Sequence, residues 1–314
     1  MGQFVNPFTD IGFKRIFGQE ISKPLIIDFL NNLLKGERTI TDLTFLDKEI
    51  PAQTIDGRSL IYDLYCKDEN DEYFIVEMQN KTQPYFKDRS IYYASQAIAQ
   101  QGEKGLEWEY KIHAVYLVAI LNFSLPDIGT TFRTDVALMD MKSKELFSEK
   151  MRMIYLQLPY FKKEAEGCEN DFERWIYVLK HMETLNRVPW MAQDSVFERL
   201  AQIADISALT KEERIKYDRS IKQYRDAISV YEGARLEGRA EGRAEGRAEG
   251  RAEGLAEGLA EGRTEGVLST ARNMKAKGFS TELTPEAIQA LCIVLPILLS
   301  ILDILNIIAT NSIY

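Results

Sequence analysis

Two carboxylates and an amide stand in short apolar runs of the kind that form buried strands. Asp63 lies in the run Leu60–Tyr65. Glu77 lies in the run Tyr73–Met78, and Gln79 follows it by two residues. Because side chains alternate between the two faces of a strand, Glu77 and Gln79 point the same way. Antiparallel pairing of the two runs would bring Asp63 beside them.

Oxygen ligands of this kind suit a hard divalent cation. Two carboxylates on neighbouring strands repel one another unless a proton or a cation lies between them. Mg²⁺ keeps several waters and takes one or two carboxylates, so Asp63 and Glu77 are candidate Mg²⁺ ligands, with Mn²⁺ as the alternative ion. The spacing alone favours two acids on the solvated face of an ordinary hairpin.

The elements that must position these residues are two strands joined by a hairpin. Tyr, Ile, Phe and Val dominate both runs, and an acidic, Asn-containing turn over Lys67–Glu72 separates them. Helical periodicity after Thr9 and Asp10 predicts a first helix, with either residue as its cap.

Apolar patterning and cap signals predict the other elements around the hairpin. They are a helix over Ser22–Leu34, a strand over Thr39–Ile50, a helix over Tyr85–Gln101 and a fully buried strand over Ile112–Leu121. The predicted order is therefore helix, three strands, helix, strand. Further strands over Thr131–Met139 and Met153–Leu158 and helices over Asp171–Met182, Ser195–Ile206 and Thr210–Glu232 are expected beyond it.

Several segments in this order resemble one family. They are Asp10–Gly18 (DIGFKRIFG), Asp63, Ile75–Gln79 (IVEMQ) and Arg89–Tyr93 (RSIYY). Together they resemble the PD-(D/E)xK nuclease family transposases, which are related to the Rpn recombination-promoting nucleases. The resemblance implies an α/β fold with a restriction-endonuclease-like core. It also implies a metal-dependent DNA endonuclease that hydrolyses phosphodiester bonds, linked to transposition or recombination.

The resemblance also implies the site residues. Asp63, Glu77 and Gln79 take the catalytic positions, with Asp63 and Glu77 holding Mg²⁺. The wider superfamily places a lysine where this chain has Gln79, and the amide cannot supply its positive charge. Lys81 and Arg89 are therefore auxiliary candidates for that charge. Asp10 is a third auxiliary candidate, as a first-helix acid near the metal, although its position favours a role as a helix cap.

The charge balance points away from broad contact with nucleic acid. The net charge is −9, and residues 1–135 hold 14 Lys and Arg against 20 Asp and Glu. A protein that neutralises many phosphates normally shows the opposite balance. The alternative hypothesis is a catalytically weak or inactive nuclease-fold interaction protein that self-associates through its C-terminal repeat. A metal-dependent nuclease acting on RNA is a third possibility.

Four regions follow from the patterning. Residues 1–165 are expected to form the nuclease-like domain and residues 166–232 a helical region. Residues 233–267 carry a Gly-rich, four-residue Ala-Glu-Gly-Arg repeat, which is either a helical stalk that joins copies into a homodimer or higher oligomer, or a flexible tether. Residues 268–314 form a C-terminal segment with an apolar tail.

Other classes of site and location find little support. Three cysteines far apart in the chain suggest neither a disulfide framework nor a zinc site. The two histidines lack partner ligands at metal-site or triad spacing. The N-terminus lacks a signal peptide pattern, and the apolar tail is interrupted by Pro296 and Asp303. We therefore expect a cytoplasmic protein without a clear membrane association.

Overall fold

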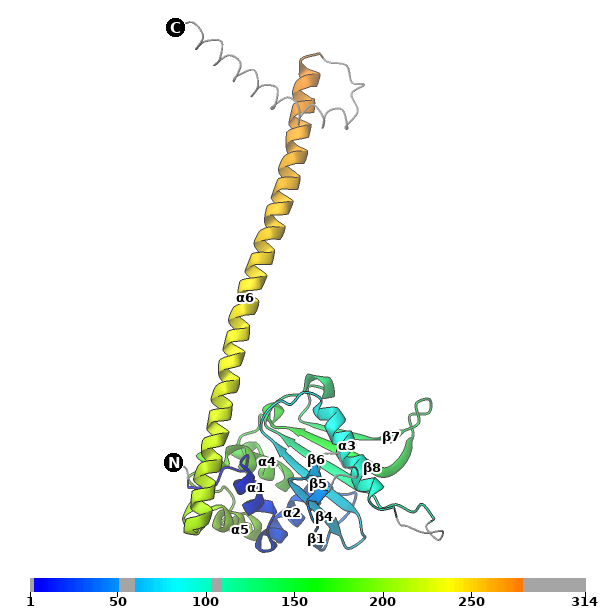
Figure 1. Cartoon of the computed structure of the whole chain (residues 1–314), viewed down its shortest axis with the longest axis vertical. Helices are drawn as coiled ribbons and strands as arrows, with labels where there is room; N and C mark the ends of the chain where they lie inside the picture. The colour runs from blue at the N-terminus through cyan, green and yellow to red at the C-terminus, as the bar shows by residue number, and fades with distance from the viewer. Residues whose placement is uncertain (1–2, 51–59, 103–108, 279–314) are drawn as a thin grey trace, which may run out of the picture. The chain divides into compact units, whose positions relative to one another are not determined.

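The structure is a computed structural model that describes residues 3–50, 60–102 and 109–278 (Figure 1). The chain forms two compact units, residues 1–230 and 231–314. The α-helices are α1 Asp10–Phe17, α2 Lys23–Leu33, α3 Phe86–Ala99, α4 Asp171–His181, α5 Ser195–Ala204 and α6 Lys211–Ala276. The strands are β1 Leu43–Phe45, β2 Glu49–Ile50, β3 Leu60–Ile61, β4 Leu64–Asp68, β5 Tyr73–Gln79, β6 Val115–Leu121, β7 Arg133–Met139 and β8 Leu146–Gln157. Short 3₁₀ turns are η1 Glu20–Ser22, η2 Pro126–Ile128, η3 Leu158–Tyr160, η4 Ala165–Gly167, η5 Met182–Thr184 and η6 Ile206–Ala208.

The first unit is built on a mixed six-stranded sheet with the order β1-β4-β5-β6-β8-β7. The strands β1, β4 and β5 pair antiparallel, so β4 and β5 form a hairpin as predicted. Its first strand differs in its limits, because the predicted run Leu60–Tyr65 is divided between β3 and β4, and β4 extends to Asp68 into the predicted turn. The strand β6 lies parallel to both β5 and β8, and α3 makes the crossover from β5 to β6. The strands β2 and β3 form a separate two-stranded pair.

Helices cover both faces of this sheet, and β6 shows why its sequence is apolar throughout. All seven of its residues are buried. Tyr116, Val118 and Ile120 pack into the core shared with α1, α2, α4 and α5. The alternate residues Val115, Leu117, Ala119 and Leu121 pack into the core shared with α3. A strand buried on both faces reads as a continuous apolar run, as predicted.

The core on the multi-helix side is centred on Trp175, which is fully buried. Its ring lies 5.7 Å from that of Phe17 and 5.9 Å from that of Phe29, so α1, α2 and α4 meet at one aromatic cluster. The indole N–H donates to Asp28 Oδ2 at 2.7 Å, which satisfies its one polar atom.

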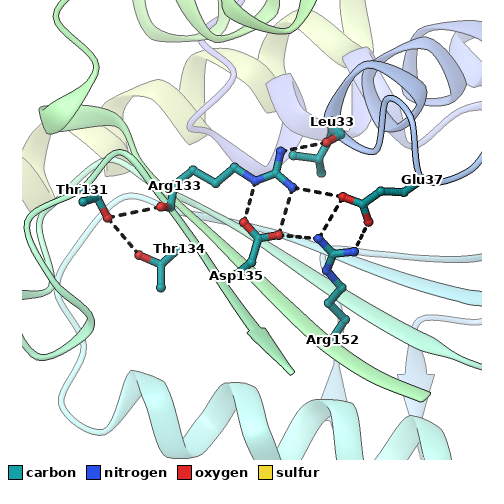
Figure 2. A network of polar contacts seen from close by, with 7 residues as sticks. All are labelled: Leu33, Glu37, Thr131, Arg133, Thr134, Asp135 and Arg152. Carbon is teal, nitrogen blue, oxygen red and sulfur yellow. Dashed lines mark hydrogen bonds and ion pairs between the residues drawn. The ribbon is translucent and has the colours of Figure 1, made fainter. Parts of the chain in front are cut away.

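A network of polar contacts ties the end of α2 to β7 and β8 (Figure 2). Arg133 donates to both oxygens of Asp135 and to the carbonyl of Leu33 at the end of α2. Arg152 bridges Asp135 to Glu37, just beyond α2. Although burial opposes it, the two guanidinium groups lower the pKa of Asp135. All four charges are satisfied within the network, which therefore has a structural role.

The first turns of α6 belong to the compact first unit. Tyr217 is buried in the multi-helix core, and its hydroxyl accepts a hydrogen bond from the N–H of Asn6 at 2.9 Å. Glu213 forms an ion pair with Arg15 of α1 at 2.7 Å. Thr210 caps α6 and exchanges hydrogen bonds with Glu213, as in a capping box.

In the second unit, α6 continues as one helix through the repeat to Ala276. The prediction that this helix ends near Glu232 is wrong, because no proline interrupts the pattern and glycine raises the cost of a helix without terminating it. Repeat residues 233–267 are helical and almost wholly exposed. Along residues 233–278, no ion pair joins Glu to Arg, as expected for opposite charges spaced two apart.

Two other predicted elements differ in their limits. The strand predicted over Thr39–Ile50 is two short strands, β1 and β2, which belong to different sheets. The strand predicted from Met153 begins earlier, at Leu146. The apolar tail lies outside the described residues. Among the described helices, none combines the length and the apolar character needed to cross a membrane.

Candidate functional site

Asp63 and Glu77 meet where the β4–β5 ladder ends. The pairing of Leu64 with Val76, continued by one residue, sets Asp63 opposite Glu77. Asp63 lies at a bend just before β4, not within a strand as its sequence suggests. Its N–H donates to Glu77 Oε1 at 3.1 Å, and the N–H of Met78 donates to Asp63 Oδ2 at 3.0 Å. Each carboxylate is thus held by the backbone of the opposite strand.

This pair lies in a poorly solvated environment. Glu77 is only 2% exposed, and Asp63 is half-buried. Burial raises the pKa of Glu77 to about 8, and the negative charge of Asp63 adds to the effect. Burial also raises the pKa of Asp63, against the opposing effect of the Met78 N–H. Both shifts favour a proton held between the two carboxyl groups when no cation is bound.

Gln79 begins a chain of side-chain contacts that ends at α3. Its Nε2 donates to Glu77 Oε2 at 3.1 Å, and its Oε1 accepts from Gln83 Nε2 at 3.1 Å. Gln83 in turn accepts a hydrogen bond from Arg89. The Arg89 guanidinium also lies 3.6 Å from Glu77 Oε2. Arg89, an auxiliary candidate from the sequence, thus lies beside the acid pair in the structure.

The start of α3 fixes the position of Arg89. Its guanidinium carbon lies 4.8 Å from the ring centroid of Tyr93, one turn along the helix. The carbonyl of Tyr93 accepts a hydrogen bond from the hydroxyl of Tyr62, the residue before Asp63. Tyr85, which precedes α3, has a φ of 61°, an unfavourable conformation for a bulky residue. The Tyr62–Tyr93 hydrogen bond and the contact of Arg89 with Glu77 therefore join α3 to the end of the hairpin.

A second group of charges lies on the Asp63 side. Asp10 is in the first turn of α1 and pairs with Lys14 at 2.7 Å. Thr9, not Asp10, caps this helix. Lys48 precedes β2, and its carbonyl accepts the N–H of Tyr62 at 3.0 Å.

The charges of this group act on Asp63. The charge of Asp10 raises the pKa of Asp63, whereas the charge of Lys48 lowers it. Burial, and then the neighbouring Lys14, lower the pKa of Lys48 itself. The ion pair with Asp10 outweighs burial and raises the pKa of Lys14. These groups therefore form one electrostatically connected site with the acid pair.

The predicted residues do not all come together. Asp63, Glu77, Gln79 and Arg89 form one contact network, and Asp10 reaches it through charge. Lys81 is exposed and makes no hydrogen bond or ion pair within the described part of the chain. Two basic residues, Lys14 and Lys48, are absent from the sequence-based candidates. Lys14 could have been predicted as a site residue, because it lies one helical turn after the candidate Asp10. The residues around Lys48 in the sequence give no such signal.

The donor set fits a cation that brings other ligands with it. Across the described residues, no three His, Cys, Asp or Glu side chains gather as a metal site. The available protein donors are the two carboxylates, and Asp63 Oδ1 accepts no hydrogen bond within the described residues. Mutual repulsion between the acids would be relieved by a cation. This combination suits Mg²⁺, which retains waters and accepts substrate phosphate oxygens.

Comparison with families of known proteins gives a match over most of the chain. The family described as PD-(D/E)XK nuclease family transposase matches residues 7–234, most of the chain and all of the site described above. No curated protein and no solved structure matches the chain significantly.

Proposed function

Because the chain belongs to the PD-(D/E)XK nuclease family transposases, we propose that it is a metal-dependent DNA endonuclease with Asp63 and Glu77 at its active site. The reaction is hydrolysis of a phosphodiester bond. The family name implies a role in transposition, and recombination is the related process that the resemblance to the Rpn nucleases suggests. The arrangement of α1, β1, β4, β5, α3 and β6 is consistent with a restriction-endonuclease-like core, set apart from the β2–β3 pair.

The observation that carries this proposal is the pairing of a buried carboxylate, Glu77, with a half-buried one, Asp63, where the β4–β5 ladder ends. A structural role would be better served by one acid and one base, because like charges destabilise a buried site. Asp63 and Glu77 are instead held together by backbone N–H donors, which fix their positions while leaving Asp63 Oδ1 for a ligand.

Asp63 and Glu77 would hold Mg²⁺ or Mn²⁺. When bound, the cation would supply the positive charge that activates water and offsets the charge of the phosphate. The residues around it have separate tasks. Gln79 holds Glu77 Oε2, and Arg89 adds a fixed positive charge near the same oxygen. Burial of Glu77 keeps bulk water from screening these charges.

Nicking of supercoiled plasmid tests the proposal. Purified protein is incubated with Mg²⁺, Mn²⁺ or EDTA at low salt, beside Asp63→Asn and Glu77→Gln, which preserve shape and remove charge. Asp71→Asn, in the exposed turn of the same hairpin, is the matched control. We expect metal-dependent nicking by the wild type and the control, and none by the two site variants. Equal nicking by all four folded proteins would refute the site.

Metal binding can be measured without cleavage. Isothermal titration of the wild type with Mn²⁺ should give one site per chain, and Asp63→Asn should remove most of the heat. Proton release should accompany binding, because the raised pKa of Glu77 leaves the metal-free pair protonated at neutral pH.

A second candidate function is a nuclease-fold interaction protein with little or no activity. One observation favours it: both the nitrogen and the oxygen of the Gln79 amide already bond other side chains, and the amide has no charge to offer the reaction. Under this alternative, residues 233–267 join copies of the chain. Sedimentation equilibrium of the full chain and of a deletion of residues 236–266 tests it, and loss of a dimer together with absent nicking would favour the alternative.

A further inference from the structure

Cationic side chains flank the acid pair on two sides. Arg89 approaches Glu77 from α3, and its guanidinium is already shared between Glu77, Gln83 and the ring of Tyr93. On the Asp63 side, Lys14 of α1 is bonded to Asp10. Both of these cations are therefore partly neutralised by protein groups.

Lys48 differs from them. Among the residues that the structure describes, no acid lies within ion-pair distance of its ammonium group. The side chain is half-buried, and the nearby Lys14 is a like charge. The charges of Asp10 and Asp63 act on Lys48 from beyond ion-pair distance. A half-buried ammonium that makes no ion pair and lies beside a second ammonium is stabilised when an anion binds it directly.

The backbone around Lys48 is well fixed. The carbonyl of Lys48 accepts the N–H of Tyr62, and the N–H of Leu46 donates to the carbonyl of Tyr65 at 2.9 Å. These two bonds lie on either side of Asp63 along the chain. Lys48 is therefore fixed by its backbone next to a proposed metal ligand.

We propose that Lys48, with Lys14 beside it, binds a non-bridging phosphate oxygen of the nucleic acid strand that is cleaved at Asp63 and Glu77. This inference rests on the proposed nuclease function and extends it to the residues that hold the substrate. A phosphodiester would supply an anion in direct contact with Lys48, and lysine binds phosphate as a compact point charge.

Two features of the chain agree with this role for Lys48. Gln79 carries no charge, so a cation for the scissile phosphate must come from another element. The excess of acidic residues in the N-terminal region makes broad phosphate contact unfavourable, whereas one lysine pair beside a bound divalent cation provides local attraction. Affinity would then come from a few contacts at the site, not from an extended basic surface.

The test is DNA binding measured without cleavage. A short fluorescently labelled duplex is titrated with the full-length protein in Ca²⁺, with fluorescence anisotropy as the readout, over a series of salt concentrations. The variants are Lys48→Gln, Lys48→Arg and Lys14→Gln. Lys67→Gln is the matched control, because Lys67 is a lysine of β4 paired with Asp71 in the hairpin turn.

We expect Lys48→Gln to weaken binding about tenfold and to reduce the salt-dependence slope by about one. Lys48→Arg should retain most of the affinity, Lys14→Gln should have a smaller effect, and Lys67→Gln should match the wild type. In plasmid nicking, Lys48→Gln should raise KM by a similar factor. Thermal melting of each variant shows that it is folded.

The outcomes separate this inference from the function on which it rests. If the wild type nicks plasmid while Lys48→Gln keeps its affinity, slope and KM, the inference is wrong and the nuclease remains. Equal losses in Lys48→Gln and Lys67→Gln would also overturn it, because they would indicate general electrostatics. If the wild type neither binds nor nicks DNA, both proposals fail.

Discussion

The backbone N–H of Asp63 donates to the side chain of Glu77 at 3.1 Å, so one proposed metal ligand positions the other. The bond forms because the chain bends at Asp63 and leaves the ladder one residue before β4. An N–H that would otherwise pair with the neighbouring strand is thereby directed to a carboxylate. The geometry of the acid pair thus depends on an interruption of regular structure.

The raised pKa of Glu77 predicts how stability depends on pH. A carboxyl with an ordinary value of 4.5 in the unfolded chain and about 8 in the fold binds more protons when folded. The contribution of Glu77 to the free energy of unfolding therefore falls as pH rises through this window. Glu77→Gln should flatten that dependence. Urea denaturation in EDTA across the window checks this, and an unchanged pH dependence in the variant would contradict it.

Arg89 and Lys81 should differ sharply in their effect on cleavage. Arg89→Met removes the positive charge near Glu77, and we expect nicking to fall about a hundredfold. Arg89→Lys should recover little, since lysine cannot both stack on Tyr93 and bond Gln83 as the planar guanidinium does. Lys81→Met should leave the rate unchanged, because Lys81 is exposed and outside the contact network. Comparable losses in both Met variants would show that Arg89 has no special position.

Gly12 should tolerate no side chain. A Cβ at this position would lie 1.9 Å from the carbonyl oxygen of Asn6, within the loop that precedes α1. We expect Gly12→Ala to lower the free energy of unfolding by about 2 kcal/mol or more. The control is Gly167→Ala, where the nearest atom to an added Cβ is 4.0 Å away. Urea denaturation of the two variants should separate them.

The repeat glycines should behave in the opposite way. Nothing lies within 4 Å of a Cβ added at Gly246 or Gly250. Each change to Ala should therefore stabilise the helix locally by about 1 kcal/mol, and thermal melting followed by circular dichroism at 222 nm would measure it. If copies of the chain pack along these glycines, the same substitutions should weaken self-association in sedimentation equilibrium. Greater helicity with unchanged association would exclude glycine packing between copies.

Most of the proposed active-site residues could be predicted because their signals are local. The hairpin follows from two β-rich runs and a polar turn, and the alternation of side chains puts Glu77 and Gln79 on one face. The buried strand β6 is visible as an apolar run. The family match agrees with the resemblance carried by these same segments.

What the sequence did not reveal depends on contacts between distant segments. Lys48 lies beside Asp63 because its own carbonyl accepts a hydrogen bond from the N–H of Tyr62. The pattern of apolar and polar residues in the sequence does not predict that bond. The bend at Asp63 is likewise invisible in a run whose composition suits a strand throughout. The end of α6 at Ala276 is not marked in the sequence either, because the glycines that follow Glu232 weaken a helix without terminating it.

The helical form of the repeat makes its length a geometric variable. Each four-residue unit lengthens a helix by about 6 Å and turns everything beyond it by about 40° about the axis. Gain or loss of one unit preserves the reading frame and the helix, yet it changes the direction faced by every later side chain. About nine units complete a full cycle of directions. The number of repeats can therefore change both the length of the helix and the direction of the side chains beyond the repeat. No residue within residues 1–230 needs to change.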